Sequence, residues 1–328
     1  ANGTVFFSTS YPSQLYETDG TAERTVPVRA FSNVGWLQGF DHFLLFAADD
    51  GTTGNEPWVS DGTEAGTFLL KDISSGPNNF LPIVWRLSGD KFLLSPDGAA
   101  PKLWASDGTP AGTVLLRDAP PGFGGVFPLM GLAATDEAFF FVSVELNDDG
   151  TSYDQLWKTD ATPAGTRPVA TPPLAGEIGA GPNGLLLFDA DDLVHGNELW
   201  ETDGTDAGTA LVKDINPSLR TDSSYANFMG AVSVPGVGPR MLFSANGGVH
   251  GFGLWISDGT SAGTRLLKDI DPGIASSQTS TAIVHNGVLF FAADEGEHGY
   301  ELWKSDGTEV GTVMVSDINP GAEGSMRY

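Results

Sequence analysis

Residues 301–308 read Glu-Leu-Trp-Lys-Ser-Asp-Gly-Thr, and versions of this octet recur along the whole chain of 328 residues. The aromatic residue of the octet returns at intervals of about 42 to 55 residues, at Tyr16, Trp58, Trp104, Trp157, Trp200, Trp255 and Trp303. An aspartate follows three residues after each aromatic residue. Self-similarity of this kind indicates a repeat-built chain, so we expect seven units that form one domain over residues 1–328.

The unit around Trp303 contains the signals of four short strands. We expect them at residues 281–285, 288–293, 300–305 and 312–317. Asn286 and Gly287 predict a type I′ hairpin between the first two strands, because both residues tolerate positive φ. The Asp-Gly-Thr triplet predicts the turn between the third and fourth strands, with the carboxylate accepting backbone N–H groups. Seven units of four antiparallel strands predict an all-β fold, a seven-bladed β-propeller.

The octet also carries a resemblance to a known family. Residues 198–205, which read Glu-Leu-Trp-Glu-Thr-Asp-Gly-Thr, and residues 301–308 resemble the ELWxxDGT repeat family of bacterial, often myxobacterial, exported proteins. The resemblance covers essentially the whole chain. It implies a propeller on a secreted, periplasmic or cell-surface protein whose signal peptide has been removed, and it implies no particular activity.

The two ends of the chain fit the same repeat. Residues 325–328, continued by Ala1, Asn2 and Gly3, align with residues 281–287. We therefore expect the last four residues to form the innermost strand of the N-terminal blade. Such a shared blade closes the ring and removes open sheet edges.

Composition narrows the class of partner. The formal net charge of −26 argues against nucleic acid and anionic membranes, whose binding rests on Lys and Arg. No apolar run is long enough for a membrane helix, so no direct membrane insertion is expected. The absence of cysteine excludes disulfides and thiol catalysis. Cations and neutral polymers remain as partners, and no organic cofactor is indicated.

The fourth unit departs from the repeat at its turn. Ala161 stands where the other units have glycine. Positive φ costs alanine about 1 kcal/mol, so we expect this turn to adopt another conformation.

Acidic loops between the second and third strands are the candidate metal sites. Clustered carboxylates in a loop supply the hard oxygen ligands that Ca²⁺ prefers. The expected ligands lie in units two, five and seven, and they are Asp49, Asp50 and Glu56, then Asp191, Asp192 and Glu198, then Asp294, Glu295 and Glu301. The alternative is that each aspartate caps its own loop, each glutamate pairs with a neighbouring lysine, and the remaining charge is solvated. Strand order places these loops on one rim with the loops that leave the fourth strands.

Three histidines occupy equivalent positions in these loops, namely His195, His250 and His298. Equivalent positions in different blades lie far apart, so they do not form one metal centre. We expect each imidazole to orient its loop by hydrogen bonding, and a role for His195 and His298 in ligand binding or pH sensing is the alternative.

Two tryptophans fall outside the octet. Trp36 and Trp85 occupy the same slot in the innermost strands of the second and third blades. Two neighbouring indoles can stack on a sugar ring, or they can fill space between blades. Both interpretations stay open at this stage.

Three classes of function remain. An enzyme needs a non-repeated constellation of unlike groups, and the acids and histidines here mostly follow the repeat. We therefore expect a binding module for a polysaccharide or a surface protein, with avidity from repeated sites. A structural role in an extracellular layer is the alternative, and a polysaccharide-degrading enzyme is less favoured.

Overall fold

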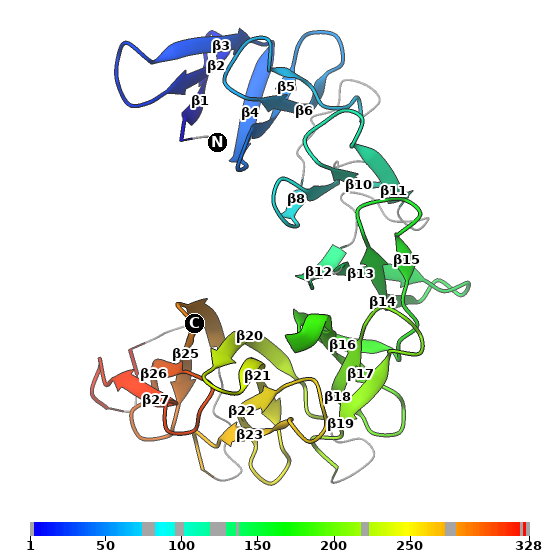
Figure 1. Cartoon of the computed structure of the whole chain (residues 1–328), viewed down its shortest axis with the longest axis vertical. Coiled ribbons are helices and arrows are strands. Elements are labelled where there is room, and N and C mark those ends of the chain that lie inside the picture. Colours follow the sequence, from blue (N-terminus) through cyan, green and yellow to red (C-terminus); the bar gives the residue numbers. More distant parts are fainter. Residues whose placement is uncertain are drawn as a thin grey trace. The chain divides into compact units, whose positions relative to one another are not determined.

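The structure is a computed structural model that describes residues 3–73, 83–95, 102–118, 129–135, 138–217, 223–272, 280–321 and 324–325. The described residues form seven β-sheets, of which six have four strands and one has three. In every sheet, strands that follow each other in sequence are hydrogen-bonded neighbours (Figure 1). The helical content of the described residues is one short 3-10 turn, η1 (Pro182–Gly184). No described helix is long and apolar enough to cross a membrane.

The chain divides into two compact units, Ala1–Leu129 with Thr159–Arg167, and Met130–Lys158 with Pro168–Tyr328. The first three sheets lie in the first unit. They contain β1 (Val5–Ser10), β2 (Ser13–Thr18) and β3 (Val26–Ala30); β4 (Asn33–Gly39), β5 (Leu44–Asp49), β6 (Asn55–Ser60) and β7 (Phe68–Leu69); and β8 (Ile83–Arg86), β9 (Phe92–Ser95), β10 (Lys102–Ser106) and β11 (Val114–Asp118).

The remaining four sheets follow in chain order. They contain β12 (Leu129–Ala134), β13 (Phe139–Leu146), β14 (Ser152–Thr159) and β15 (Arg167–Pro168); β16 (Leu174–Ala180), β17 (Leu186–Asp191), β18 (Asn197–Thr202) and β19 (Ala210–Lys213); β20 (Asn227–Val234), β21 (Gly238–Asn246), β22 (Phe252–Ser257) and β23 (Arg265–Lys268); and β24 (Ser280–His285), β25 (Val288–Asp294), β26 (Tyr300–Ser305) and β27 (Val313–Ser316). The all-β class and the four strands expected around Trp303 are confirmed.

The hairpin between β24 and β25 has the expected turn. Asn286 and Gly287 both have positive φ, 50° and 77°. His285 lies opposite Val288, so the two strands are joined by these two residues alone. Positive φ at both central positions is the condition for a type I′ turn.

The turn between β26 and β27 explains why the octet ends in Asp-Gly-Thr. Asp306 Oδ1 accepts the backbone N–H and the hydroxyl of Thr308, at 2.9 and 2.7 Å. The buried hydroxyls of Ser305 and Thr312 lie 2.8 Å apart. The N–H of Gly307, whose φ is 84°, donates to Ser305 Oγ. Every polar group that the turn buries here has a partner, which buried polar groups need.

The fourth unit keeps this turn, so our expectation for Ala161 was wrong. Ala161 has φ 70°, and its N–H donates to Thr159 Oγ1 at 3.0 Å. Asp160 Oδ1 accepts the N–H and hydroxyl of Thr162, at 2.8 and 2.6 Å. The surrounding hydrogen bonds hold an alanine in a conformation that it would not choose alone.

Hydrophobic clusters lie between successive sheets and include five of the octet aromatics, Trp58, Trp104, Trp200, Trp255 and Trp303. Trp58, Trp255 and Trp303 are almost fully buried, at 2, 7 and 5% exposure, as a packing role requires. In the first unit β4 contacts β1 (Figure 1), and in the second unit β20 contacts both β16 and β24. Such packing of successive four-stranded meanders is typical of propeller blades. Ring closure by residues 325–328 stays a prediction, since 326–328 lie outside the described residues.

The turn of the fourth unit gives a stability test. Ala161→Gly removes the cost of positive φ, so we expect the free energy of unfolding to rise by about 0.5 to 1 kcal/mol. The matched variant Gly307→Ala adds that cost at φ 84°, and it also places a Cβ atom 2.5 Å from Val234 Cγ2. We expect it to lower stability by at least 1 to 2 kcal/mol. Urea denaturation measures both, and a destabilised Ala161→Gly variant would contradict this account.

Candidate functional site

The loop rim is tied together by three buried glutamates at or next to the start of the third strand. Glu56, Glu198 and Glu301 have 0% exposure. Each accepts a backbone N–H from the loop that leaves the fourth strand, and the donors are Ile73 at 2.8 Å, Ile215 at 2.7 Å and Ile318 at 3.1 Å. The expectation that the two loops of a blade share one rim is therefore confirmed. The alternative in which these glutamates pair with lysines stays open, and the hydrogen bonds described for them come from backbone N–H groups and, at Glu301, from the Ser325 hydroxyl.

The glutamates of the fifth and seventh blades differ in acidity. Burial raises the pKa of Glu198 to about 7, although it accepts the N–H groups of Ile215 and Asn216. Burial also acts on Glu301, but hydrogen bonds from Ser325, Ile318 and Asn319 outweigh it and lower its pKa. The Ser325 hydroxyl donates to Glu301 over 2.6 Å. The same motif residue thus has a different charge state near neutral pH in the two blades.

The loop aspartates cap their own loops with one oxygen. Asp49 Oδ1 accepts the N–H of Gly51 at 2.7 Å, and Asp294 Oδ1 accepts the N–H of Gly296 at 2.8 Å. Asp191 accepts the N–H of Leu193 at 2.7 Å. These bonds are Asx turns, in which the side chain replaces a backbone acceptor. Each of these hydrogen bonds occupies one oxygen of its carboxylate.

Asp50 and Asp192 cap the next position of the same loops. Asp50 Oδ1 accepts the hydroxyl and the N–H of Thr52, and the hydroxyl is the larger cause that lowers the pKa of Asp50. Asp192 Oδ1 accepts the N–H groups of Val194 and His195, at 2.9 and 2.8 Å. Both carboxylates are therefore held in fixed orientations at the rim.

Each of the three rim histidines contacts a carboxylate through Nδ1, as expected of loop-orienting groups. His195 lies 2.7 Å from Asp192 Oδ2, and His250 lies 3.2 Å from Asp269 Oδ2. His298 contacts Glu295 Oε1. The hydrogen bond to the carboxylate is the main cause that raises the pKa of His195 and of His298. The carboxylate stands three residues earlier in the same loop for His195 and His298, and it comes from the loop after the fourth strand for His250.

The seventh blade gathers the groups best placed to hold a cation. Ligand atoms of Glu295, Glu297 and His298 lie within 4.8 Å of one another. Asp317 Oδ2, from the loop after β27, lies 4.0 Å from His298 Nε2. Carboxylate oxygens suit Ca²⁺, Mg²⁺ and Mn²⁺, whereas an imidazole ligand favours transition metals. Of the predicted ligands of this blade, Glu295 belongs to the group, Asp294 caps the loop beside it, and Glu301 is turned inward.

The aspartates that leave the fourth strands carry a second repeated feature. Among the described residues, Oδ1 is buried without a hydrogen-bond partner in Asp214, Asp269 and Asp317. Unpaired buried oxygens are costly, so a cation or an ordered water is a fitting partner. This feature recurs in the fifth, sixth and seventh blades and was not predicted.

Asp189 in β17 is a buried acid that the sequence analysis missed. It is 2% exposed, and its Oδ1 has no hydrogen-bond partner within the described part of the chain. Burial, with the nearby charges of Glu198 and Asp191, raises its pKa to about 7. Strand register places Ala47 and Ala292 at the same position in other blades, and this contrast is the signal that could have revealed Asp189.

The two extra tryptophans lie in the innermost strands as expected, but the prediction that they share one slot was wrong. Trp85 lies opposite Leu93, and the equivalent position of β4 is Gln38, opposite Leu45. Trp36 stands two residues before Gln38, because β4 has an extra residue at its register shift and the turn after β8 is one residue longer than the turn after β4. Trp36 has φ 45° at a register shift of β4, and it packs against the cluster that contains Phe92 and Leu94. Trp85 is half-buried in β8, opposite Leu93. Packing between the second and third sheets therefore accounts for Trp36, and a sugar-binding role stays a prediction for both.

Asp189 makes stability depend on pH. Its folded-state pKa of about 7 exceeds its ordinary value of 3.8. The folded protein therefore loses stability as the pH rises from about 4 to 7, by up to about 4 kcal/mol. We expect Asp189→Ala to raise the free energy of unfolding by about this amount at pH 8 and by little at pH 4. Denaturation series at both pH values test this, with the exposed Asp206→Ala as control. An equal effect of Asp189→Ala at both pH values would contradict the assignment.

No family model and no curated protein sequence matches this chain. Among solved structures, puromycin hydrolase matches with a TM-score of 0.44 and 12% identity, over 99% of this chain and 52% of that one. The apo form of prolyl oligopeptidase B from Galerina marginata matches with a TM-score of 0.48 and 12% identity, over 87 and 43%. The β-propeller domain of the Trilobed protease from Pyrococcus furiosus matches with a TM-score of 0.41 and 12% identity, over 96 and 94%. The chain spans about half of the first protein, and likenesses at this level carry no information on activity.

Proposed function

We propose that this protein is a repeat-built binding protein of the cell exterior that recognises a polysaccharide or a surface protein. The observation that carries the proposal is the recurrence of similar polar groups at the rim. The His Nδ1 contact to a carboxylate and the aspartate with a buried, unpaired Oδ1 recur in the fifth, sixth and seventh blades. Repeated sites suit a repetitive ligand, because several weak contacts combine into avidity.

The recurrence also favours binding over catalysis. A catalytic site brings unlike groups together at one place. The rim acids and imidazoles of the described residues follow the repeat instead. Asp189 breaks the repeat, but it is 2% exposed and is not presented to a substrate. The exported location rests on the resemblance of the octets to exported repeat proteins.

The same proposal includes the binding of divalent cations, with Ca²⁺ as the first candidate. In the seventh blade Glu295, Glu297 and Asp317 would supply carboxylate oxygens, with His298 beside them. In the second and fifth blades the candidates are Asp49, Asp50 and Asp191, each through the oxygen that does not cap its loop, whereas both oxygens of Asp192 have partners in the described structure. A bound cation would neutralise part of the acidic rim and fix the loops for ligand contact.

Calcium binding is tested by thermal denaturation. We expect 1 mM CaCl₂ to raise the melting temperature of chelator-treated protein. Sites with a Kd of about 10⁻⁴ M would each add about 1.4 kcal/mol. The double variant Glu295→Gln/Glu297→Gln should lose part of the shift, and Glu309→Gln, which removes an exposed acid elsewhere, should keep it. An unchanged melting temperature in millimolar Ca²⁺ would remove the cation from the proposal.

Ligand recognition is tested on a glycan array with and without Ca²⁺. We expect binding to polymeric glycans that is stronger than binding to their short fragments, because avidity needs several sites. Trp36→Ala and Trp85→Ala distinguish the two roles of the tryptophans. Unchanged glycan binding with lower stability means packing, and lost binding at unchanged stability means a sugar contact. Release of new reducing ends from a bound glycan would instead establish an enzyme.

A further inference from the structure

The glycine of the Asp-Gly-Thr turn packs against the preceding sheet. A Cβ atom placed on Gly108 would lie 2.5 Å from the ring of Phe43, and one on Gly259 would lie 3.7 Å from Leu185. Phe43 and Leu185 each stand one residue before the second strand of their sheet. An apolar side chain at this slot therefore fills the seam between one sheet and the turn of the next.

Two sheets have a basic residue at this slot. Strand register aligns Lys91 and Arg240 with Phe43 and Leu185. Lys91 directly precedes Phe92, and Arg240 directly precedes Met241. A cavity opens beside each of them, of about 240 Å³ at Lys91 and about 290 Å³ at Arg240. All residues that line the first cavity belong to the first compact unit, and all that line the second belong to the second unit.

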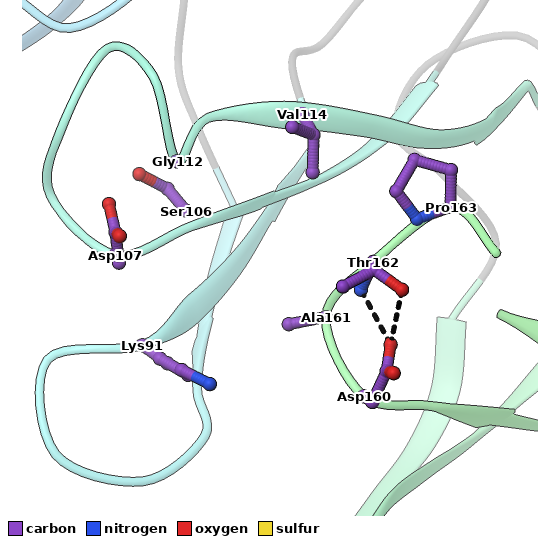
Figure 2. A pocket seen from close by; sticks show the side chains of 9 residues that line it. All are labelled: Lys91, Ser106, Asp107, Gly112, Val114, Asp160, Ala161, Thr162 and Pro163. Atoms are coloured by element: carbon purple, nitrogen blue, oxygen red, sulfur yellow. Dashed lines mark hydrogen bonds between the residues drawn. The ribbon is translucent and has the colours of Figure 1, made fainter. Parts of the chain in front are cut away.

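The two cavities are built from equivalent residues. Each has the basic residue, the aspartate of its own turn, and the turn of the next sheet. In Figure 2, Lys91 points into the space between Asp107 and Ala161, with Asp160 and Pro163 on the far side. In the second cavity Arg240 lies 3.5 Å from Asp258, and Thr308 and Glu309 come from the next turn. The same site has thus been formed twice at equivalent seams.

Hydrogen-bonding capacity, and not net charge, is what the two cavities share. The first has one cation with two carboxylates, Asp107 and Asp160, and the second has Arg240 and Arg265 with Asp258 and Glu309. One oxygen of Asp107 and of Asp258 is occupied by a turn threonine. A cationic donor beside a carboxylate acceptor matches a hydroxyl group, which both donates and accepts.

The remaining lining is small and apolar. Val114, Ala161 and Pro163 line the first cavity, and Val234 and Ile256 line the second. Apolar walls with a few placed polar groups are the usual composition of a small-molecule site. The C–H face of a sugar ring can lie on such walls while its hydroxyls meet the charged groups. Both volumes lie just below the range of drug-sized ligands, which suits a single sugar unit.

We infer that these two seam cavities, at Lys91 and at Arg240, are subsites for neutral monosaccharide units of a polysaccharide. The inference rests on the proposed function, since it names where the glycan would be held. Lys91 and Arg240 donate to ring hydroxyls, and Asp107 and Asp258 accept from adjacent hydroxyls. The slot that holds Phe43 and Leu185 at two other seams is here a recognition position.

The test replaces both basic residues with an apolar side chain in the whole chain. The double variant Lys91→Leu/Arg240→Leu places leucine, as at Leu185, in both seams. We expect it to reduce the binding of neutral monosaccharides at least tenfold. Saturation-transfer NMR with glucose, galactose, mannose and N-acetylglucosamine measures this binding. Thermal denaturation should show unchanged or higher stability. Arg24→Leu/Lys304→Leu removes the same charge at exposed positions away from the cavities and should keep binding. If the leucine variant is unstable, Lys91→Met/Arg240→Met keeps side-chain length and gives the same test.

The outcomes separate this inference from the proposed function. If the wild type binds array glycans and the leucine variant binds equally well, the seam cavities are not the subsites and the binding function stands. If glucuronate binds better than the neutral sugars, the neutral class is wrong. If the wild type binds neither array glycans nor monosaccharides, both proposals fall.

Discussion

In five blades the rim is held by a link between the start of the third strand and the exit of the fourth. A buried glutamate provides it in three blades, as in Glu198, whose two oxygens accept the N–H groups of Ile215 and Asn216. Other blades meet the same constraint differently. Gln155 donates to the carbonyl of Val169 at 2.9 Å, and Lys102 lies 3.6 Å from Asp118. Because unpaired backbone groups are costly when buried, the loops that carry the candidate site are held by this link before any ligand arrives.

A second constraint acts at the seams and connects two departures from the repeat. The turn glycine has positive φ and also lies against the preceding sheet, so two conditions favour glycine there. In the fourth blade the preceding sheet offers Lys91 and an open cavity in place of an apolar plug. The Cβ atom of Ala161 therefore has room. The unfavourable feature of alanine at this position is then its positive φ. Lys91 and Ala161, about one and a half repeats apart in sequence, are thus parts of one local arrangement.

The sequence was sufficient to predict the sheets. It was not sufficient to predict which groups hydrogen-bond to the carboxylates of the rim. Alternation and the Asn286-Gly287 turn placed the strands of the last unit within one or two residues, because these signals are local. The role of Glu301 was missed, although Ile318 follows it by 17 residues as Ile73 and Ile215 follow their glutamates. That constant spacing was a readable signal. Asp189 gave none by itself, since an acid in a strand looks exposed until register shows its neighbours to be apolar.

Departures from a repeat are informative when they bring no gain in stability. An alanine would suffice at Asp189, as Ala47 and Ala292 show, yet the fifth blade buries a carboxyl group without a described partner. Burying an unpaired polar group costs free energy, and the group responds by staying protonated to about neutral pH. Glu198, on the neighbouring strand, shares this behaviour. The fifth blade therefore contains two acids that change charge in the same pH range, and one of them holds the rim loop. Both glutamates hold the same kind of loop, but burial dominates the pKa of Glu198, whereas the hydrogen bonds of Glu301 outweigh its burial.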